Sequence, residues 1–255
     1  TSGTTGLPKA ALVDHAKLVK GSFAGHFLCF NFKKKDRLYM TLPLYHSTGL
    51  VLGWAASLRS GCANIIKPKF SASEFWDDVK KYKANKFIYV GELCRYLMNL
   101  PASETDKSNS IVQISGNGLR PDIWDSFQKR FNIKKIVEIY GATEAVGMTV
   151  NSFGRSGMIG RKRSDSTIIH CNKDDGSPIL NEQGYCTKIS EGETGLYIQK
   201  ISSSAKFQGY LDAQASNKKI LQNVFNEGDQ YFNTGDLITL HAVSYTHLRA
   251  HETSI

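Results

Sequence analysis

The chain has 255 residues, of which 41% are hydrophobic and 22% charged, an ordinary composition for a globular protein with a sizeable core. Its apolar runs fall short of the roughly 18–20 residues that a membrane-spanning helix needs. The longest run, at 49–58, is expected to form a buried helix. The net charge of +9 favours an anionic partner, but no nucleic-acid-binding motif accompanies it, so nucleic acid is not an expected partner. Solvated helix faces and loops are the preferred interpretation of the charge, with acidic lipid headgroups or phosphate-bearing substrates as the alternative.

Short β-rich runs alternate with helical stretches from Arg37 to Glu144. This alternation predicts an α/β fold in which helices cover a mainly parallel, doubly wound sheet. The expected strands are 37–43, 64–67, 86–90, 111–115 and 136–140.

The helices between these strands have recognisable starts. Ser71 and Glu74 form a capping-box pattern, and Pro121 suits the first turn of a second helix. Each start is followed by apolar residues that recur on one helix face, and we expect them to be core. They are Phe75, Val79 and Tyr82 in the first helix and Trp124, Phe127 and Phe131 in the second.

The character of the sequence changes after Thr149, where glycines and turn residues multiply and helical periodicity fades. We expect an α/β subdomain at 1–149 and a smaller β-rich subdomain at 150–240, which together form part of one larger domain. The short strands expected in the second part include 167–171, 195–201 and 237–240.

The tail at 241–255 has three histidines, at 241, 247 and 251, and no apolar periodicity. We expect this tail to be foreign to the protein, with a histidine-rich metal site as the alternative. The five cysteines are widely spaced and form no CxxC pair, so reduced core thiols in a cytosol-facing protein are expected rather than disulfides or zinc.

The opening of the chain combines two glycines, four hydroxyl groups and a lysine. Glycines let the backbone approach a ligand closely, and exposed N–H groups, hydroxyls and a lysine all suit phosphate oxygens. It is not a Walker A loop, because two residues separate the second glycine from the lysine. Phosphate binding is favoured over a plain Gly/Thr-rich hairpin. The segment reads Thr1, Ser2, Gly3, Thr4, Thr5, Gly6, Leu7, Pro8 and Lys9.

A second candidate segment directly follows the last expected strand of the sheet, and it reads Tyr140, Gly141, Ala142, Thr143 and Glu144. Ligands of open α/β sheets bind beyond the carboxyl ends of the strands, so this position suits a site. Thr143 can donate to a phosphate oxygen and Glu144 can hold Mg²⁺, which prefers carboxylate and phosphate oxygens. Taken alone, the segment is better interpreted as a turn with one acid.

Three weaker candidates remain. Gly116, Asn117 and Gly118 end another expected strand, where glycine permits a flat ring to approach, although Asn-Gly is also a common turn. Asp236 follows Thr234 and Gly235, and its carboxylate can accept hydrogen bonds from both hydroxyls of a ribose, although this too is a common turn. His46 lies at the tip of a strand, where a lone histidine is more often structural than catalytic.

The order and spacing of these segments resemble the adenylate-forming superfamily of acyl-CoA synthetases, luciferases and peptide-synthetase adenylation domains. Within it, the sequence is most similar to the fatty acid transport protein / very-long-chain acyl-CoA synthetase family. The resemblance covers about 1–240, a partial AMP-binding domain. The stretches that carry the family-specific resemblance are 69–78, 91–97, 116–120 and 217–220.

The resemblance implies a role for each segment. Residues 1–9 would cradle the ATP phosphates, residues 116–118 would lie beside adenine, Tyr140 would stack near the base, and Asp236 would hold the ribose hydroxyls. The catalytic residues implied are Lys9, His46 near the substrate carboxylate, Thr143 at the α-phosphate, and Glu144 as the Mg²⁺ ligand.

The activity implied is ATP-dependent conversion of a long- or very-long-chain fatty acid to its coenzyme A ester through an acyl-adenylate, coupled to fatty-acid uptake. Ligases for a bile or aryl acid, and a non-catalytic transport or nucleotide-binding protein, are the alternatives. We expect the chain to be a piece of such an enzyme and by itself inactive, because the family's C-terminal domain, with its catalytic lysine, is not recognisable. The resemblance also implies membrane association through an N-terminal part, at the endoplasmic reticulum or plasma membrane, with the catalytic domain facing the cytosol.

Overall fold

The computed structural model describes residues 9–203, 205–242 and 245–248. The chain divides into two compact units. The parallel-sheet unit contains Asp14–Ile139 and Val150–Gly157, and the β-rich unit contains Thr1–Val13, Tyr140–Thr149 and Met158–Ile255. The α/β fold class is confirmed, while the predicted domain boundaries at 149 and 240 stay predictions.

The first sheet has six strands in the order β2-β1-β3-β4-β5-β6, and β1 to β5 pair in parallel. Parallel neighbours cannot be joined by a hairpin, so helices connect them. The strands are β1 (Arg37–Met40), β2 (Ala63–Ile66), β3 (Lys86–Val90), β4 (Gln113–Asn117), β5 (Lys135–Tyr140) and β6 (Thr149–Asn151). The five strands expected from 37 to 140 are therefore confirmed to within three residues at each end.

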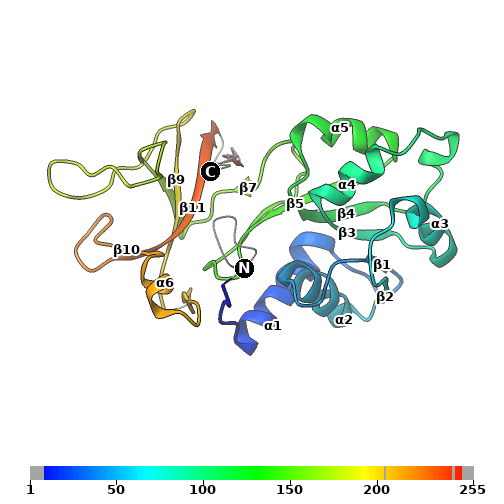
Figure 1. The fold of residues 1–255 in the computed structure, drawn as a ribbon, viewed down its shortest axis with the longest axis horizontal. Helices are drawn as coiled ribbons and strands as arrows, with labels where there is room; N and C mark the ends of the chain where they lie inside the picture. The colour runs from blue at the N-terminus through cyan, green and yellow to red at the C-terminus, as the bar shows by residue number, and fades with distance from the viewer. Residues whose placement is uncertain (1–8, 204, 243–244, 249–255) are drawn as a thin grey trace. The chain divides into compact units, whose positions relative to one another are not determined.

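Helices lie on both faces of this sheet, with α4 and α5 on one side and α1 and α2 on the other (Figure 1). The doubly wound arrangement is therefore as expected. The helices are α1 (His15–Ala24), η1 (Gly25–Phe30), η2 (Thr48–Ala55), α2 (Ala56–Ser60), α3 (Ala72–Tyr82), α4 (Gly91–Met98), η3 (Glu104–Lys107) and α5 (Pro121–Arg130). The apolar run at 49–58 is helical, as predicted, but only partly buried, since Leu58 at its end is exposed.

The predicted helix starts are confirmed. Ser71 caps α3 by accepting a hydrogen bond from the backbone N–H of Glu74 at 3.4 Å, and Pro121 is the first residue of α5. The aromatic faces of both helices are core, with Tyr82 only half-buried. Phe75, Val79, Trp124, Phe127 and Phe131 are buried.

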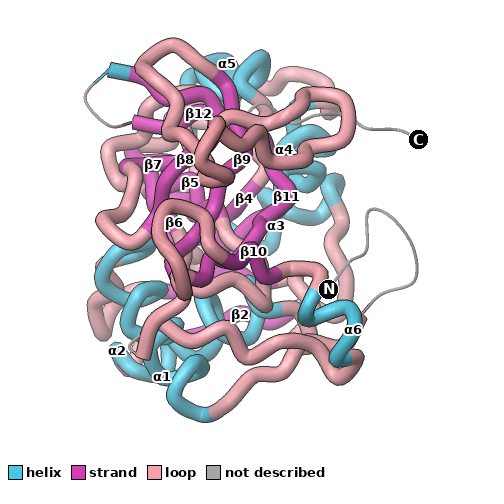
Figure 2. The backbone as a smooth tube through the Cα atoms, turned by 90° about the vertical axis from the view of Figure 1, so that its left-hand side faces the viewer, coloured by secondary structure: helices cyan, strands magenta, loops and turns pink. Residues whose placement is uncertain are grey.

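The β-rich unit is built on a second sheet in the order β7-β12-β11-β9-β8, with β10 paired to β11. Figure 2 shows the strands of the chain in magenta. The described strand pairs of the second sheet are antiparallel. Its core contains Ile169, Leu196 and Ile198 on one face and Tyr197 and Ile238 on the other. The elements are β7 (Gly160–Arg161), β8 (Ser166–Ile169), β9 (Thr194–Lys200), α6 (Ala213–Asn217), β10 (Ile220–Gln222), β11 (Gln230–His241) and β12 (Tyr245–Leu248).

Part of the tail belongs to this sheet, because the backbone of β12 pairs with β11 and with β7. Its origin outside the protein stays a prediction, and His251 lies outside the described residues. Across the described part of the chain, no group of three His, Cys, Asp or Glu side chains is placed to hold a metal ion.

All five cysteines are buried and carry free thiols, as expected. Burial raises the pKa of Cys29 to about 12, and it also raises the pKa of the other four thiols. Within the described ranges, no helix is both long and apolar enough to cross a bilayer.

Candidate functional site

The segment that follows β5 forms the centre of the candidate site in the β-rich unit. Tyr140 is the last residue of β5, and its phenol donates a hydrogen bond of 2.5 Å to Oδ2 of Asp236 on β11. Two residues that lie 96 positions apart in the sequence, both predicted to contact the nucleotide, are therefore in direct contact.

Asp236 reaches this position through an irregularity in β11. The register between β11 and β9 shifts between Asn233 and Leu237, and Gly235 has a φ of +82°, a conformation that favours glycine. The hydroxyl of Thr234 donates to the carbonyl of Tyr197 at 2.7 Å and accepts from the N–H of Asp236 at 3.1 Å. Thr-Gly-Asp is therefore a bulge inside a strand, which re-aims the carboxylate, and not a connecting turn.

The surroundings of the Tyr140–Asp236 pair raise the pKa of both side chains. Desolvation by the surrounding protein raises the pKa of Asp236, although part of the residue is exposed. The hydrogen bond from Tyr140 and the charge of Lys219 act in the opposite direction and lower this pKa. Burial first, and then the charge of Asp236, raise the pKa of Tyr140 well above its ordinary value. Tyr140 therefore stays a neutral donor at neutral pH.

Glu144 lies four residues beyond Tyr140 and is 8% exposed. Its Oε1 accepts a hydrogen bond of 2.7 Å from the phenol of Tyr210. Its Oε2 is buried and has no hydrogen-bond partner within the described part of the chain. A buried carboxylate oxygen without a partner is costly, so its persistence favours a role in binding a cation. One carboxylate together with substrate phosphates is a common way of holding Mg²⁺, and Glu144 fits this arrangement.

Tyr210 is a site residue that the sequence analysis missed. It is buried, and the backbone on either side of it pairs with the segment that follows Lys9: Leu12 N–H donates to Gly209 O, and Leu211 N–H donates to Ala10 O, each at 3.0 Å. Lys9 Nζ lies 5.8 Å from the centroid of the Tyr210 ring. Burial raises the pKa of Tyr210, so its phenol remains a donor to Glu144. A single tyrosine outside any recognised motif gave no signal for this role.

Gln199 on β9 is a second residue that was missed. It is 2% exposed, and its Oε1 accepts from the N–H groups of Val146 and Gly147 at 3.0 and 3.2 Å. Its Nε2 donates to the carbonyl of Gly147 at 3.0 Å. The amide thus substitutes for a neighbouring strand and fixes the backbone just beyond Glu144.

The glycine segment at the end of β4 lies in the parallel-sheet unit. A β-carbon at Gly116 would overlap the carbonyl of Tyr89 on β3, so this position requires glycine. Asn117 and Gly118 are exposed, and Gly118 has a φ of +81°. The N–H groups of Gly118 and Leu119 both donate to Oε1 of Glu138. An exposed edge with an anchored backbone can present a flat surface to a ring.

His46 also belongs to the parallel-sheet unit, just before η2. It is half-buried, its Nδ1 accepts from the N–H of Thr48 at 3.2 Å, and burial lowers its pKa. The hydrogen bond leaves Nε2 as the N–H donor of the neutral imidazole at physiological pH.

The predicted site residues are thus distributed over both units. The β-rich unit brings Lys9, Tyr140, Glu144 and Asp236 together, whereas His46 and residues 116–118 belong to the other unit. Gly141 and Ala142 are exposed, and Thr143 is half-buried. The predicted phosphate-binding residues Thr1, Ser2, Gly3, Thr4, Thr5 and Gly6 lie outside the described residues.

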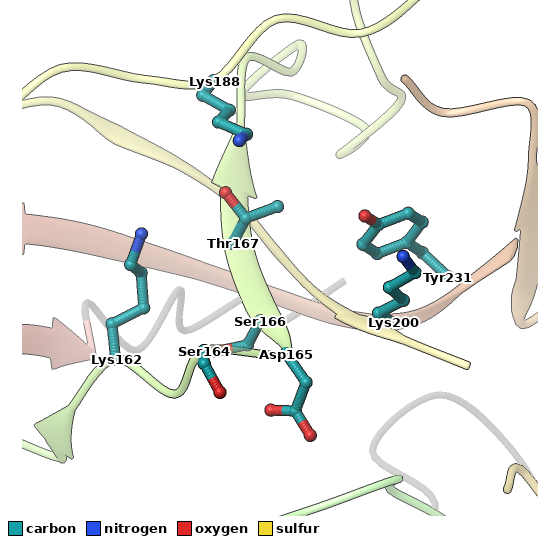
Figure 3. Close-up of a pocket in the computed structure, with 8 residues that line it drawn as sticks. All are labelled: Lys162, Ser164, Asp165, Ser166, Thr167, Lys188, Lys200 and Tyr231. Carbon is teal, nitrogen blue, oxygen red and sulfur yellow. The ribbon is translucent and has the colours of Figure 1, made fainter. Parts of the chain in front are cut away.

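A separate pocket of about 130 Å³ lies on the β-rich unit (Figure 3). Its lining includes Lys162, Lys188 and Lys200, and its one carboxylate, Asp165, forms a bidentate pair with Arg163 at 2.5 and 2.8 Å. None of the predicted site residues lines this pocket.

Comparison with known proteins identifies the family. A family model described as "AMP-binding enzyme" matches residues 1–193. Long-chain fatty acid transport protein 3 of Mus musculus is 42% identical over 254 residues, which cover 97% of this chain and 38% of that protein. The medium/long-chain-fatty-acid–CoA ligase FadD6 of Mycobacterium tuberculosis is 37% identical over 239 residues, which cover 94% of this chain and 40% of that protein. The chain therefore spans less than half the length of these curated relatives.

Solved structures agree on the fold. ATP-bound MatB of Rhodopseudomonas palustris superposes with a TM-score of 0.77 at 21% identity, over 97% of this chain and 46% of that one. A malonyl-CoA ligase with methylmalonyl-CoA and AMP bound gives a TM-score of 0.69 at 21% identity, over 97% and 51%. The chain belongs to the family of AMP-binding enzymes, and its predicted resemblance to the fatty acid transport proteins and fatty-acid–CoA ligases is confirmed.

Proposed function

We propose that the complete protein containing this chain activates a long- or very-long-chain fatty acid with ATP and transfers it to coenzyme A. The observation that carries the proposal is the pair of carboxylates in the β-rich unit. Glu144 keeps one buried oxygen without a partner among the described residues, and Asp236 is held beside Tyr140 at 2.5 Å. One carboxylate suits a metal bound to phosphates, and the other suits the hydroxyls of a ribose. The relatives named for fatty acids supply the substrate class.

The proposed reaction has two steps. In the first, a fatty carboxylate oxygen attacks the α-phosphorus of ATP, and the bond to the β-phosphate oxygen breaks to release pyrophosphate. In the second, the thiol of coenzyme A loses its proton to solvent and its sulfur attacks the acyl carbon, and AMP leaves with the electron pair of the C–O bond. Negative charge develops on the phosphate oxygens in the first step, so preorganised donors aimed at these oxygens lower its barrier.

The residues divide this work. Residues 1–6 and Lys9 bind the departing phosphates, Thr143 donates to an oxygen of the α-phosphate, and the Nε2–H of His46 orients the fatty carboxylate. In the β-rich unit, Tyr140 stacks near the adenine base, and Gly141 and Ala142 form the backbone between Tyr140 and Thr143. In the parallel-sheet unit, residues 116–118 are the segment that we assign to recognition of the base. Asp236 accepts from the ribose hydroxyls, and Tyr140 orients that carboxylate. Glu144 would hold Mg²⁺ through Oε2, and the ion supplies positive charge that neutralises phosphate oxygens.

Uptake and activation are compatible, because trapping a fatty acid as its coenzyme A ester draws more of it across a membrane. We therefore place the complete protein at the endoplasmic reticulum or plasma membrane, with this part facing the cytosol. Free, buried thiols agree with a reducing surrounding.

The test is acid-dependent exchange of radiolabelled pyrophosphate into ATP by the complete protein, with long-chain, bile and aryl acids in parallel. Exchange with long-chain acids alone supports the proposal. Exchange with a bile or aryl acid alone would move the protein to another ligase class. A folded protein that binds ATP but exchanges with no acid would leave a transport or nucleotide-binding role.

Replacement of Tyr210 by phenylalanine is expected to weaken metal binding about tenfold, the usual effect of losing a hydrogen bond to a metal ligand. Without the 2.7 Å bond to Oε1, the Glu144 carboxylate is free to rotate and its Oε2 is no longer held in place. Electron paramagnetic resonance can follow Mn²⁺ binding to the ATP complex. Tyr231→Phe, at a half-buried tyrosine of the same unit, is the control. Equal Mn²⁺ affinities of the two variants would contradict the assignment.

A further inference from the structure

Glu138 is a buried carboxylate that the reaction described above does not use. It lies in the middle of β5 and is 7% exposed. Its Oε2 accepts a hydrogen bond of 2.5 Å from the phenol of Tyr89 on β3, and its Oε1 accepts from the N–H groups of Gly118 and Leu119, the latter at 3.2 Å. Through these hydrogen bonds, the side chain of Glu138 connects the C-terminal end of β4 to its two neighbouring strands, β3 and β5.

The contacts of this segment are unusually close. A β-carbon at Gly91, the first residue of α4, would overlap the carbonyl of Gly118, and one at Gly116 would overlap the carbonyl of Tyr89. Backbone therefore packs directly on backbone at Gly91 and Gly116. Glu138 supplies the anchor from the neighbouring strand.

A carboxylate in this position costs stability. Burial raises the pKa of Glu138 from 4.5 to about 7, even though the bonds from Tyr89, Gly118 and Leu119 act in the opposite direction. Because the folded-state pKa lies above the ordinary value, the ionised form destabilises the fold increasingly as pH rises from 4.5 to about 7. A group kept at such a cost, beside a candidate ligand surface, is typical of functional sites.

We propose that ionised Glu138 is a positioning residue that sets residues 116–119 for recognition of the nucleotide base. This inference rests on the proposed function, which puts this segment beside adenine. Ionised Glu138 accepts from all three donors at once. Protonation removes the negative charge that strengthens the hydrogen bonds from Gly118 and Leu119, so the segment loses part of its anchorage.

The other titratable groups around Glu138 do not change charge near neutrality. They are Tyr89 on β3 and Cys94 on α4, and burial raises the pKa of both well above their ordinary values. A transition near pH 7 in this part of the unit therefore belongs to Glu138.

The test measures AMP binding to the complete protein by titration calorimetry between pH 6 and pH 8. The AMP affinity of the wild-type protein is divided by that of Glu138→Gln at each pH. The titration of AMP itself affects both proteins equally and cancels in this ratio. This ratio is expected to rise about tenfold with pH, the equivalent of one charge-assisted hydrogen bond, with its midpoint near 7. Tyr89→Phe is expected to move the midpoint to higher pH, because the Tyr89 bond lowers the pKa of Glu138.

Two controls separate positioning from general damage. Asp78→Asn changes another buried carboxylate of the same unit, one that accepts from the phenol of Tyr39 at 2.8 Å, and should leave the pH profile of AMP binding intact. Binding of pyrophosphate, which has no base, should be the same in wild type and Glu138→Gln. If Glu138→Gln does not fold, the wild-type profile and its displacement in Tyr89→Phe still decide the matter.

The outcomes distinguish this inference from the proposed function. A ratio that stays at one across the pH range, with acid-dependent exchange intact, overturns the role of Glu138 alone. Equal weakening of AMP and pyrophosphate binding also overturns it, since that indicates a structural defect. A rising ratio without exchange for any acid supports the role of Glu138 and rejects the ligase. A wild-type protein that binds no AMP rejects both.

Discussion

Replacement of Glu144 by alanine is expected to lower fatty-acid-dependent ATP–pyrophosphate exchange by about 10²- to 10³-fold, the loss caused by removing one preorganised electrostatic group. Glu144 is buried, and its Oε2 has no partner among the residues that the structure describes, so a bound cation is the natural complement of this oxygen. The measurement uses the complete protein with saturating long-chain acid and a titration of Mg²⁺.

Glu182→Ala is the matched control, because Glu182 is an exposed acid of the same unit. It should exchange at the wild-type rate. Full activity of a folded Glu144→Ala would remove the metal assignment and with it the main structural support for adenylation. Restoration of activity by excess Mg²⁺ would instead indicate weakened metal binding and would agree with the assignment.

Replacement of Phe75 by alanine is expected to lower the free energy of unfolding by about 3–5 kcal/mol, the usual result of emptying a buried aromatic position. Phe75 is 1% exposed, and its ring centroid lies 4.8 Å from that of Phe87 and 5.1 Å from that of Tyr39. It therefore joins α3 to two neighbouring strands of the parallel sheet. Urea unfolding followed by circular dichroism gives the free energy.

Tyr96→Ala serves as the control for Phe75, since Tyr96 is an aromatic residue of the same unit that is 45% exposed. Its expected cost is below about 1 kcal/mol. If both variants lower the free energy of unfolding by the same amount, the aromatic face of α3 is not the main contributor to the stability of this unit.

The parallel sheet was predictable from local patterns because each of its elements carries its own signal. Buried parallel strands are short apolar runs, and α3 and α5 begin with a cap at Ser71 and a proline at 121. The candidate site segments could also be located from local patterns, because their glycines and polar residues follow directly after strands. The Tyr140–Asp236 contact was not predictable in this way, because 96 positions separate the two residues.

The supporting residues were missed because their roles depend on contacts between distant segments. Tyr210 lies 66 positions from Glu144, and Gln199 lies 52 positions from Gly147. A tyrosine or glutamine has no periodicity that distinguishes a buried hydrogen-bonding role from an ordinary surface position. Glu138 lies in an expected strand, and its role is visible only from its hydrogen bonds with Tyr89 on β3 and with the residues at the end of β4. The bulge that carries Asp236 was not predicted, because a bulge inside a strand has the same residues as a turn.

The buried cysteines can report local unfolding of the protein through their reaction with alkylating reagents. Only the thiolate reacts with alkylating reagents, and burial suppresses it at every cysteine of this chain. Cys29, Cys62 and Cys94 lie in the parallel-sheet unit, and Cys171 and Cys186 lie in the β-rich unit. Pulsed alkylation followed by peptide mass spectrometry therefore reports the opening of each unit separately, without an engineered probe. Nucleotide that protects one set of thiols more than the other would show which unit carries more of the binding energy.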